Sequence, residues 1–343
     1  MGFYNFCFSL VAFFFALGWW LRWQGRMGPP AVAVLAVLAL WVYFAHPVSF
    51  VLAFVAILTL AGWRMLLEWR ETGLWRGLWA WVLPPLLAFL PALVLMATFV
   101  GQRLDRQVAG LSLWVRIKHL ASLYSLVSMD RRVVVFSTAF AALLAAFAVA
   151  CVLRRRGREP RDGLLLVALV FTLIYFVAPN DLSGGGFIVH RINLYVFLAL
   201  LPWLAGFPLG RRERLLLQAG AVAVALGILG LLWPRYARVN DGLREVVAAG
   251  EHIPPDTTVL ALSYARFGLA PDGSPLVFRV RPFLHPVGHI AARKRIVDLS
   301  LYPADEDYFP IFFTPALNPY DTIGIRDGME ADPPRVDFLG YPE

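Results

Sequence analysis

Charged residues are scarce in this sequence of 343 residues: they make up 16% of the chain, whereas hydrophobic residues make up 59%. A soluble domain carries about 25% charged and about 45–50% apolar residues. The scarcity of charge therefore excludes an ordinary soluble enzyme, a disordered chain and an ordinary nucleic-acid-binding protein. The composition, with a mean hydropathy of +0.65, predicts an integral membrane protein.

Cysteine is also rare, and the familiar catalytic motifs are missing. Cys7 and Cys151 lie inside apolar runs that the topology below puts near opposite membrane faces, so no disulfide is expected. The sequence has no P-loop, G-x-G-x-x-G, G-x-S-x-G or C-x-x-C motif, so nucleotide hydrolysis and serine or thiol catalysis have no support. We expect no cofactor, and nothing in the sequence supports a divalent metal.

Charge is unevenly divided along the chain. Residues 1–236 hold 21 Lys and Arg against 8 Asp and Glu, a net of +13. Residues 237–343 hold 10 against 15, a net of −5. The arginines of the first part cluster between apolar runs, as topology signals do, so we expect no nucleic-acid partner.

Eight apolar segments approach the roughly 20 residues that a transmembrane helix needs. They lie at residues 3–21, 30–46, 48–66, 77–99, 133–153, 163–179, 193–210 and 215–233. Proline interrupts the fourth segment, which membrane helices tolerate where neighbours satisfy the freed carbonyl groups. We therefore expect an all-α membrane bundle over residues 1–236.

Arginines set the expected orientation of this bundle. One set of alternate loops holds 13 of them, whereas the other set, the long 100–132 loop aside, holds only Arg191. The positive-inside rule makes the first set cytoplasmic, so both the N-terminus and the C-terminal part face outward. A first helix that crosses inward and opens on Met-Gly-Phe-Tyr-Asn, with no charged residue before it, is typical of an internal helix. We therefore expect the chain to be the C-terminal part of a longer protein.

The loop at 100–132 contains a predicted interfacial helix at 111–127. Its apolar residues fall at helical spacing: Leu113, Trp114, Ile117, Leu120, Tyr124 and Val127. Its other side is polar: Arg116, Lys118, His119, Ser122 and Ser125. This pattern indicates an amphipathic helix in the outer interface, although a helix that only packs on the bundle has the same pattern.

Charged clusters flank this helix. They are Arg103, Asp105 and Arg106 on one side, and Asp130, Arg131 and Arg132 on the other. We interpret them as solvated surface. The alternative is a clamp for an anionic headgroup, made with Lys118 and His119.

Residues 237–343 change character, with shorter apolar runs and more acids and prolines. Asn240 or Asp241 is expected to cap a helix that ends near Gly250. Strands are expected at 257–262, 276–280 and 295–299, with a short helix at 287–293. This alternation predicts a small α/β domain outside the membrane.

The loop from Pro179 to Arg191 has the most distinctive local sequence. Gly184, Gly185 and Gly186 let the backbone approach a ligand and point N–H groups at an anion. His190 and Arg191 follow at the start of the next helix, where an arginine suits a lipid phosphate. The alternative is a flexible turn with an arginine that reaches to headgroups. His46, at the tip of the second and third helices, is either a polar helix end or a site residue.

Four stretches together resemble a known family. They are Gly2 to Phe6 before the first helix, His46 to Phe50 at a helix-pair tip, the Pro179–Arg191 loop, and Pro254 to Leu260 at the entry to the last domain. The pattern resembles the C-terminal half of bacterial membrane glycosyltransferases of the GT-C type. That group includes protein mannosyltransferases and aminoarabinose transferases.

The resemblance implies a helical bundle of the bacterial inner membrane, with interfacial helices and a periplasmic C-terminal domain. It also implies transfer of a sugar from a polyprenyl-phosphate carrier to an acceptor, with a carboxylate of the first outer loop as general base or as a group that orients the acceptor. His190, Arg191, Lys118 and Arg103 would then hold the lipid phosphate, and membrane lipids would surround the bundle. Here the first outer loop, His46-Pro47-Val48, has no acid.

The missing acid leaves Asp181 as a weak candidate for orienting an acceptor or a metal. It also fits a chain that lacks the catalytic first loop, to be supplied by an N-terminal half or a partner chain. Two other functions remain open from the sequence. One is a non-catalytic envelope protein whose outer domain binds a partner, and the other is a ligase or polymerase of surface polysaccharide.

Overall fold

The computed structural model describes residues 4–73, 78–101, 110–155, 157–181, 186–305 and 311–341. It comprises two compact units, which we describe separately. The bundle unit contains residues 2–126 and 134–224, and the C-terminal unit contains residues 127–133 and 225–343.

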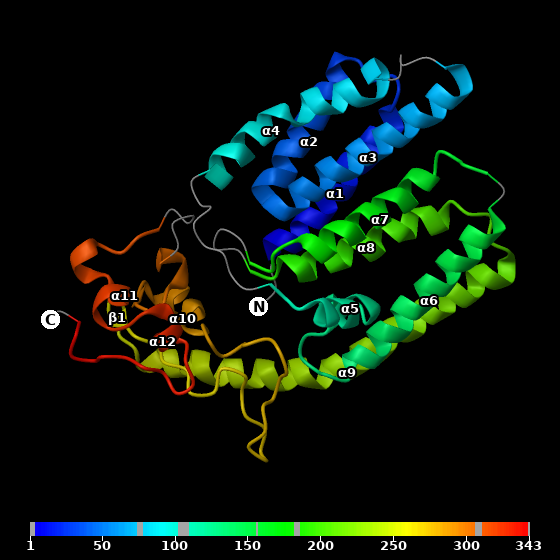
Figure 1. Ribbon diagram of the computed structural model, residues 1–343. Helices are drawn as coiled ribbons and strands as arrows, with labels where there is room; N and C mark the ends of the chain where they lie inside the picture. Colours follow the sequence, from blue (N-terminus) through cyan, green and yellow to red (C-terminus); the bar gives the residue numbers. More distant parts are fainter. Residues whose placement is uncertain are drawn as a thin grey trace. The chain divides into compact units, whose positions relative to one another are not determined.

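The bundle unit is built from helices alone within its described residues (Figure 1). In chain order they are α1 (Tyr4–Trp23), α2 (Pro29–Ala45), α3 (Pro47–Thr72), the π-helical turn η1 (Leu78–Val82), α4 (Leu83–Gly101), α5 (Leu113–Ala121), the 3₁₀ turn η2 (Tyr124–Leu126), α6 (Val133–Arg154), α7 (Asp162–Val177), α8 (Ile188–Ala205) and the first part of α9 (Arg211–Ala249).

Each of the eight predicted apolar segments forms a helix. Six of the helices in the described part of the chain are long and apolar enough to cross a membrane, while α2 and α7 are apolar but shorter. The architecture is therefore that of a helical, membrane-associated protein, as expected from the composition.

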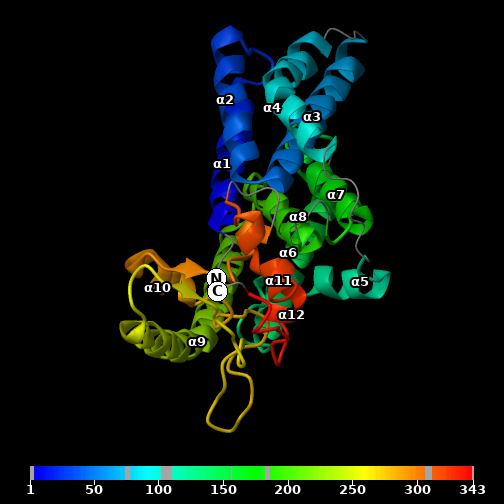
Figure 2. The ribbon, with the colours of Figure 1, turned by 90° about the vertical axis from the view of Figure 1, so that its left-hand side faces the viewer.

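The core of the bundle unit lies among α1 to α4, α7 and α8, which run side by side in both views (Figures 1 and 2). Large side chains such as Phe50, Phe171 and Trp203 are fully buried there. Alanines fill the positions between them and let the helices approach closely. A hydrogen bond of 2.6 Å between the hydroxyl groups of Ser9 and Ser49 links α1 to α3 inside this core.

Helix α9 is the most exposed of the candidate membrane-spanning helices in the described part of the chain. None of its apolar window is buried, compared with 22% for each of α4 and α6. Gly220 of α9 lies against α6, because a Cβ there would be 2.7 Å from the side chain of Leu143.

Two helix predictions need correction. The predicted helix at 111–127 is divided, because α5 ends at Ala121 and Leu123 adopts a left-handed φ of 45° before η2. The helix expected to start at Asn240 is instead the continuation of α9, which passes through Pro234 without a break for 39 residues. A proline removes one backbone hydrogen bond, and the turns on both sides hold α9 continuous.

The C-terminal unit contains little regular structure in its described residues. Its elements after α9 are η3 (Gly250–His252), β1 (Thr258–Val259), α10 (Val287–Lys294), β2 (Val297–Asp298), η4 (Tyr302–Asp305), η5 (Pro315–Leu317), α11 (Pro319–Thr322) and α12 (Arg326–Met329). The strands β1 and β2 pair in parallel, Thr258 with Val297 and Val259 with Asp298. Helix α10 matches the helix predicted at 287–293.

The strand expected at 276–280 does not form. Its backbone N–H groups donate hydrogen bonds to two separate segments, and not to a single partner strand. Leu276 N donates to Gly268 O at 3.0 Å, and Phe278 N donates to Met129 O at 2.9 Å. This segment thereby joins the 127–133 segment to the rest of the C-terminal unit.

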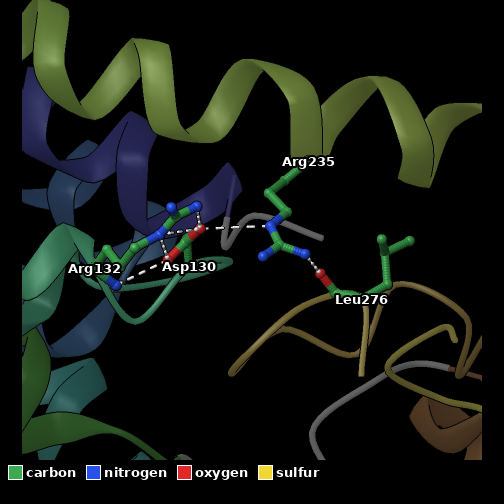
Figure 3. Close-up of polar contacts among 4 residues, drawn as sticks. All are labelled: Asp130, Arg132, Arg235 and Leu276. Atoms are coloured by element: carbon green, nitrogen blue, oxygen red, sulfur yellow. Dashed lines mark hydrogen bonds and ion pairs between the residues drawn. The ribbon is translucent and has the colours of Figure 1, made fainter. Parts of the chain in front are cut away.

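Asp130 fixes the same junction through its carboxylate (Figure 3). It accepts hydrogen bonds from Arg132 Nη2 at 2.8 Å and from Arg235 Nε at 3.4 Å, while Arg235 Nη1 donates to Leu276 O at 2.8 Å. The side chain of Asp130 is only 4% exposed. The interpretation of this cluster as solvated surface is therefore wrong for Asp130, although Arg131 and Arg132 are exposed.

Candidate functional site

The site is built around the start of α8. Phe187 adopts a left-handed φ of 62° immediately before the helix. Ile188 N donates to Asn180 O at 2.8 Å, so the two ends of the glycine-rich loop meet. His190 and Arg191 therefore lie in the first turn of α8. Gly184 and Gly185 lie outside the described residues.

Arg191 faces the first turn of α1. Its guanidinium carbon lies 5.6 Å from the ring centroid of Phe6, a cation–π arrangement. The ring of Phe6 in turn meets the imidazole of His46 edge-on, at a centroid distance of 5.4 Å. Two of the predicted site residues, His46 and Arg191, are thus brought together through a residue of the N-terminal motif.

His46 is the only residue between α2 and α3. It caps the start of α3, because its Nδ1 accepts a hydrogen bond from Val48 N at 3.2 Å. Burial, together with the positive charge of Arg191, lowers the pKa of His46 to about 4. The imidazole is therefore neutral at pH 7, as its acceptor role requires.

His190 faces the short segment from α5 to η2. His119 stacks flat on Tyr124 with ring centroids 4.0 Å apart, and the ring of His190 lies 5.1 Å from that of His119. The ring centroid of Phe187 lies 6.0 Å from that of His190. We call the set Phe6, His46, His119, Tyr124, His190 and Arg191 the α8 cluster.

A buried asparagine ties α5 and η2 to α8. Asn193 is fully buried, its Nδ2 donates to His119 O at 3.1 Å, and its Oδ1 accepts from Ser125 Oγ at 2.7 Å. This contact fixes the stacked rings against the first turn of α8. Asn193 is not among the predicted site residues, although a lone amide in an apolar helix is a recognisable signal.

Arg116 has a structural role that its sequence position does not predict. The helical pattern places it on the polar side of the amphipathic helix, whereas the structure buries it. It is only 6% exposed and donates to Tyr175 O at 2.6 Å and Ala178 O at 2.8 Å, the last carbonyls of α7. A cation at a helix C-terminus is favourable. Helix α5 therefore points its arginine inward.

The apolar face of α5 is consequently exposed. Leu113 is 65% exposed and Trp114 63% exposed. Such a face suits the hydrocarbon boundary of a membrane, and the interfacial position of this helix remains a prediction.

The remaining predicted site residues do not belong to the α8 cluster. Lys118 is exposed, with its Nζ 5.1 Å from the ring centroid of Trp114. Asp181 accepts a hydrogen bond from Asn180 Nδ2 at 2.9 Å and packs against Gly186, where a Cβ would lie 2.7 Å from its Oδ1. Arg103 lies outside the described residues.

The α8 cluster combines one arginine, three imidazoles and aromatic rings. Among the described residues, no group of three His, Cys, Asp or Glu side chains is placed to hold a metal ion. Such a site can bind an anion by charge and can stack a ring. No protein-family model matches the chain, and no curated protein or solved structure is significantly similar to it.

Proposed function

We propose that the protein binds a polyprenyl-phosphate-linked sugar at the α8 cluster and acts in glycosyl transfer in the bacterial inner membrane, as the C-terminal part of a GT-C-type enzyme. In this proposal the cluster and the C-terminal unit face outward. The carrier phosphate lies at His190 and Arg191, and the apolar chain follows the exposed face of α5 into the bilayer.

The first turn of α8 carries the proposal. The N-terminus of a helix is its positive end and favours an anion. The 18-residue helix α8 adds two basic residues, His190 and Arg191, in its first turn, which contains no acidic residue. A phosphate would be stabilised by both side chains and by the helix end.

Two further features support a lipid ligand rather than a free anion. The site is at the end of an apolar helix, and α5 beside it exposes Leu113 and Trp114. The stacked rings of His119 and Tyr124 offer a flat surface of the kind against which a sugar ring packs.

A binding measurement on the full chain in lipid nanodiscs tests the phosphate role. Arg191→Ala is expected to weaken binding of a polyprenyl phosphate roughly tenfold, the loss of one charge-assisted contact. Arg212→Ala, at an exposed arginine in the first turn of α9, is the matched control and should bind as the wild type does. Equal binding by Arg191→Ala and the wild type would contradict the proposal.

The connection between α2 and α3 favours a second function, a non-catalytic envelope protein with a partner-binding domain. Only His46 separates the two helices, so the first outer connection has no room for a catalytic acid. A transfer assay with a polyprenyl-phosphate-linked sugar separates the two functions. Turnover that falls in Asp181→Asn supports catalysis by this chain. Carrier binding without turnover fits the C-terminal part of an enzyme that lacks its catalytic loop, whereas the absence of both carrier binding and turnover supports the non-catalytic function.

A further inference from the structure

A cavity lies at the other end of the bundle unit from the α8 cluster. Helix α1 connects the two places, with Phe6 near its start and Gln24 just beyond its end. The cavity has a volume of about 370 Å³, within the range of small-ligand sites. Leu21, Leu60 and Leu164 contribute to its apolar lining. Its polar lining side chains are Gln24, Arg64, Glu159 and Arg161.

Arg64 is held in a fixed orientation at this cavity. Its Nε donates to Gln24 Oε1 at 2.9 Å, and its guanidinium carbon lies 5.8 Å from the ring centroid of Trp81. Its two terminal nitrogens donate no hydrogen bond to any residue that the structure describes.

Arg64 is also a half-buried charge without a counter-ion in the described part of the chain. The other arginine at the cavity differs: Arg161 Nε pairs with the carboxylate of Glu159 at 2.8 Å. Glu68, one turn beyond Arg64 on α3, instead accepts a hydrogen bond from Trp81.

A half-buried guanidinium with free donors favours an anionic ligand with several oxygen acceptors. The position of Arg64 along α3 indicates that this anion is a lipid headgroup and not a soluble ion. From Pro47, at the start of α3, to Arg64 the helix rises roughly 25 Å, close to the thickness of a bilayer core, about 30 Å. Trp63 and Trp81 lie beside Arg64, and tryptophans are common at a membrane interface.

We propose that this cavity binds the phosphate of an anionic glycerophospholipid in the leaflet at the Arg64 end of the bundle. In the proposed orientation this is the cytoplasmic leaflet. Basic pockets between transmembrane helices on that side are suited to anionic headgroups. The acyl chains would remain in the bilayer, and only the headgroup phosphate would enter the cavity.

Lipid titration of the purified full chain, followed by native mass spectrometry, tests this site with phosphatidylglycerol as the probe. Arg64→Gln is expected to bind phosphatidylglycerol roughly tenfold more weakly than the wild type. Arg70→Gln, an exposed arginine further along α3, is the matched control and should bind unchanged. Equal affinity of Arg64→Gln and the wild type would overturn the proposal.

Four comparisons identify the ligand and guard against a folding defect. Gln24→Leu keeps the charge of Arg64 but removes its Nε acceptor, and should give an intermediate loss. Phosphatidylcholine should bind weakly to the wild type, and inorganic phosphate should not compete; effective competition by inorganic phosphate would overturn the lipid source. Arg191→Ala should leave phosphatidylglycerol binding unchanged, so failure of this site and failure of the α8 cluster are distinguishable.

Discussion

The two units of this protein are stabilised in different ways. The bundle unit has one continuous apolar core that involves α1 to α4, α7 and α8. The C-terminal unit has three small apolar clusters, around Val277, Leu299 and Ile290. Between its clusters lie buried or half-buried ion pairs, such as those of Asp130 and Glu330. The bundle unit also has a buried carboxylate, Asp162, paired with Arg155 at 3.7 Å, but most of its buried residues belong to one packed core. The C-terminal unit has only small cores, so we expect ion pairs to contribute a larger share of its stability.

The largest expected effect is the removal of a core ring from the bundle. Phe171 of α7 is fully buried, and Phe171→Ala should destabilise the bundle by about 3–5 kcal/mol through the cavity left behind. Leu173, two residues along and 67% exposed, gives the matched control Leu173→Ala. Unfolding by denaturing detergent measures both variants. Similar midpoints for the two would show that α7 does not depend on core packing.

A smaller effect is expected when charge is removed from the C-terminal unit. Asp130→Asn leaves Arg132 and Arg235 without their carboxylate and should cost about 2–3 kcal/mol, less than a fully buried pair because Arg132 is exposed. Asp241→Asn removes an exposed pair with Arg244 and should cost about 0.5 kcal/mol or less. Hydrogen exchange of residues 225–249 measures both. If the two variants exchange alike, the junction around Asp130 is not stabilised by charge.

The smallest expected effect is a difference in acid sensitivity. Burial alone would raise the pKa of Glu330, but hydrogen bonds from His285 and Arg326 outweigh it and lower the pKa to about 2. A lowered carboxylate pKa contributes stability above the unfolded value, which is lost as the pH falls toward the folded value. The C-terminal unit should therefore lose on the order of 1–2 kcal/mol between about pH 5 and pH 2.

The bundle should respond in a higher pH range. The pKa of His46 is lowered from 6.5 to about 4, so folding favours the neutral imidazole. Its contribution is present above pH 6.5 and is lost as the pH falls toward 4. Hydrogen exchange measured as a function of pH reports the loss of stability in both ranges. Glu330→Gln should weaken the pH dependence only in the lower range. Glu251→Gln, at an exposed glutamate, is the control and should leave both ranges unchanged. A single shared transition in the wild type would contradict this separation.

The helices of the bundle could be predicted from sequence because apolar length alone requires them in a membrane. The continuity of α9 could not, since Pro234 looks like a helix end unless the turns on both sides are known. The prediction of a strand at 276–280 was wrong for a related reason. Its apolar pattern suits a strand, but its hydrogen-bond partners come from Met129 and Gly268, which lie in distant parts of the sequence.

The candidate site could be predicted in part. His46, His190 and Arg191 stand out locally, and the structure brings them near Phe6 and His119. The inward direction of Arg116 could not be read from helical periodicity, because its acceptors are carbonyls of α7 some sixty residues away. Polar residues on an amphipathic helix are assigned to water by default, whereas in a bilayer the protein interior also offers partners.

The one-residue connection at His46 limits how this protein can be engineered. Exposed loop tips commonly accept an epitope tag or a fluorescent reporter. Here the tip residue closes the hairpin, caps α3 and contacts Phe6. An inserted tag would disrupt the connection, the helix cap and the ring contact together. Reporters are therefore better attached at other positions than at His46.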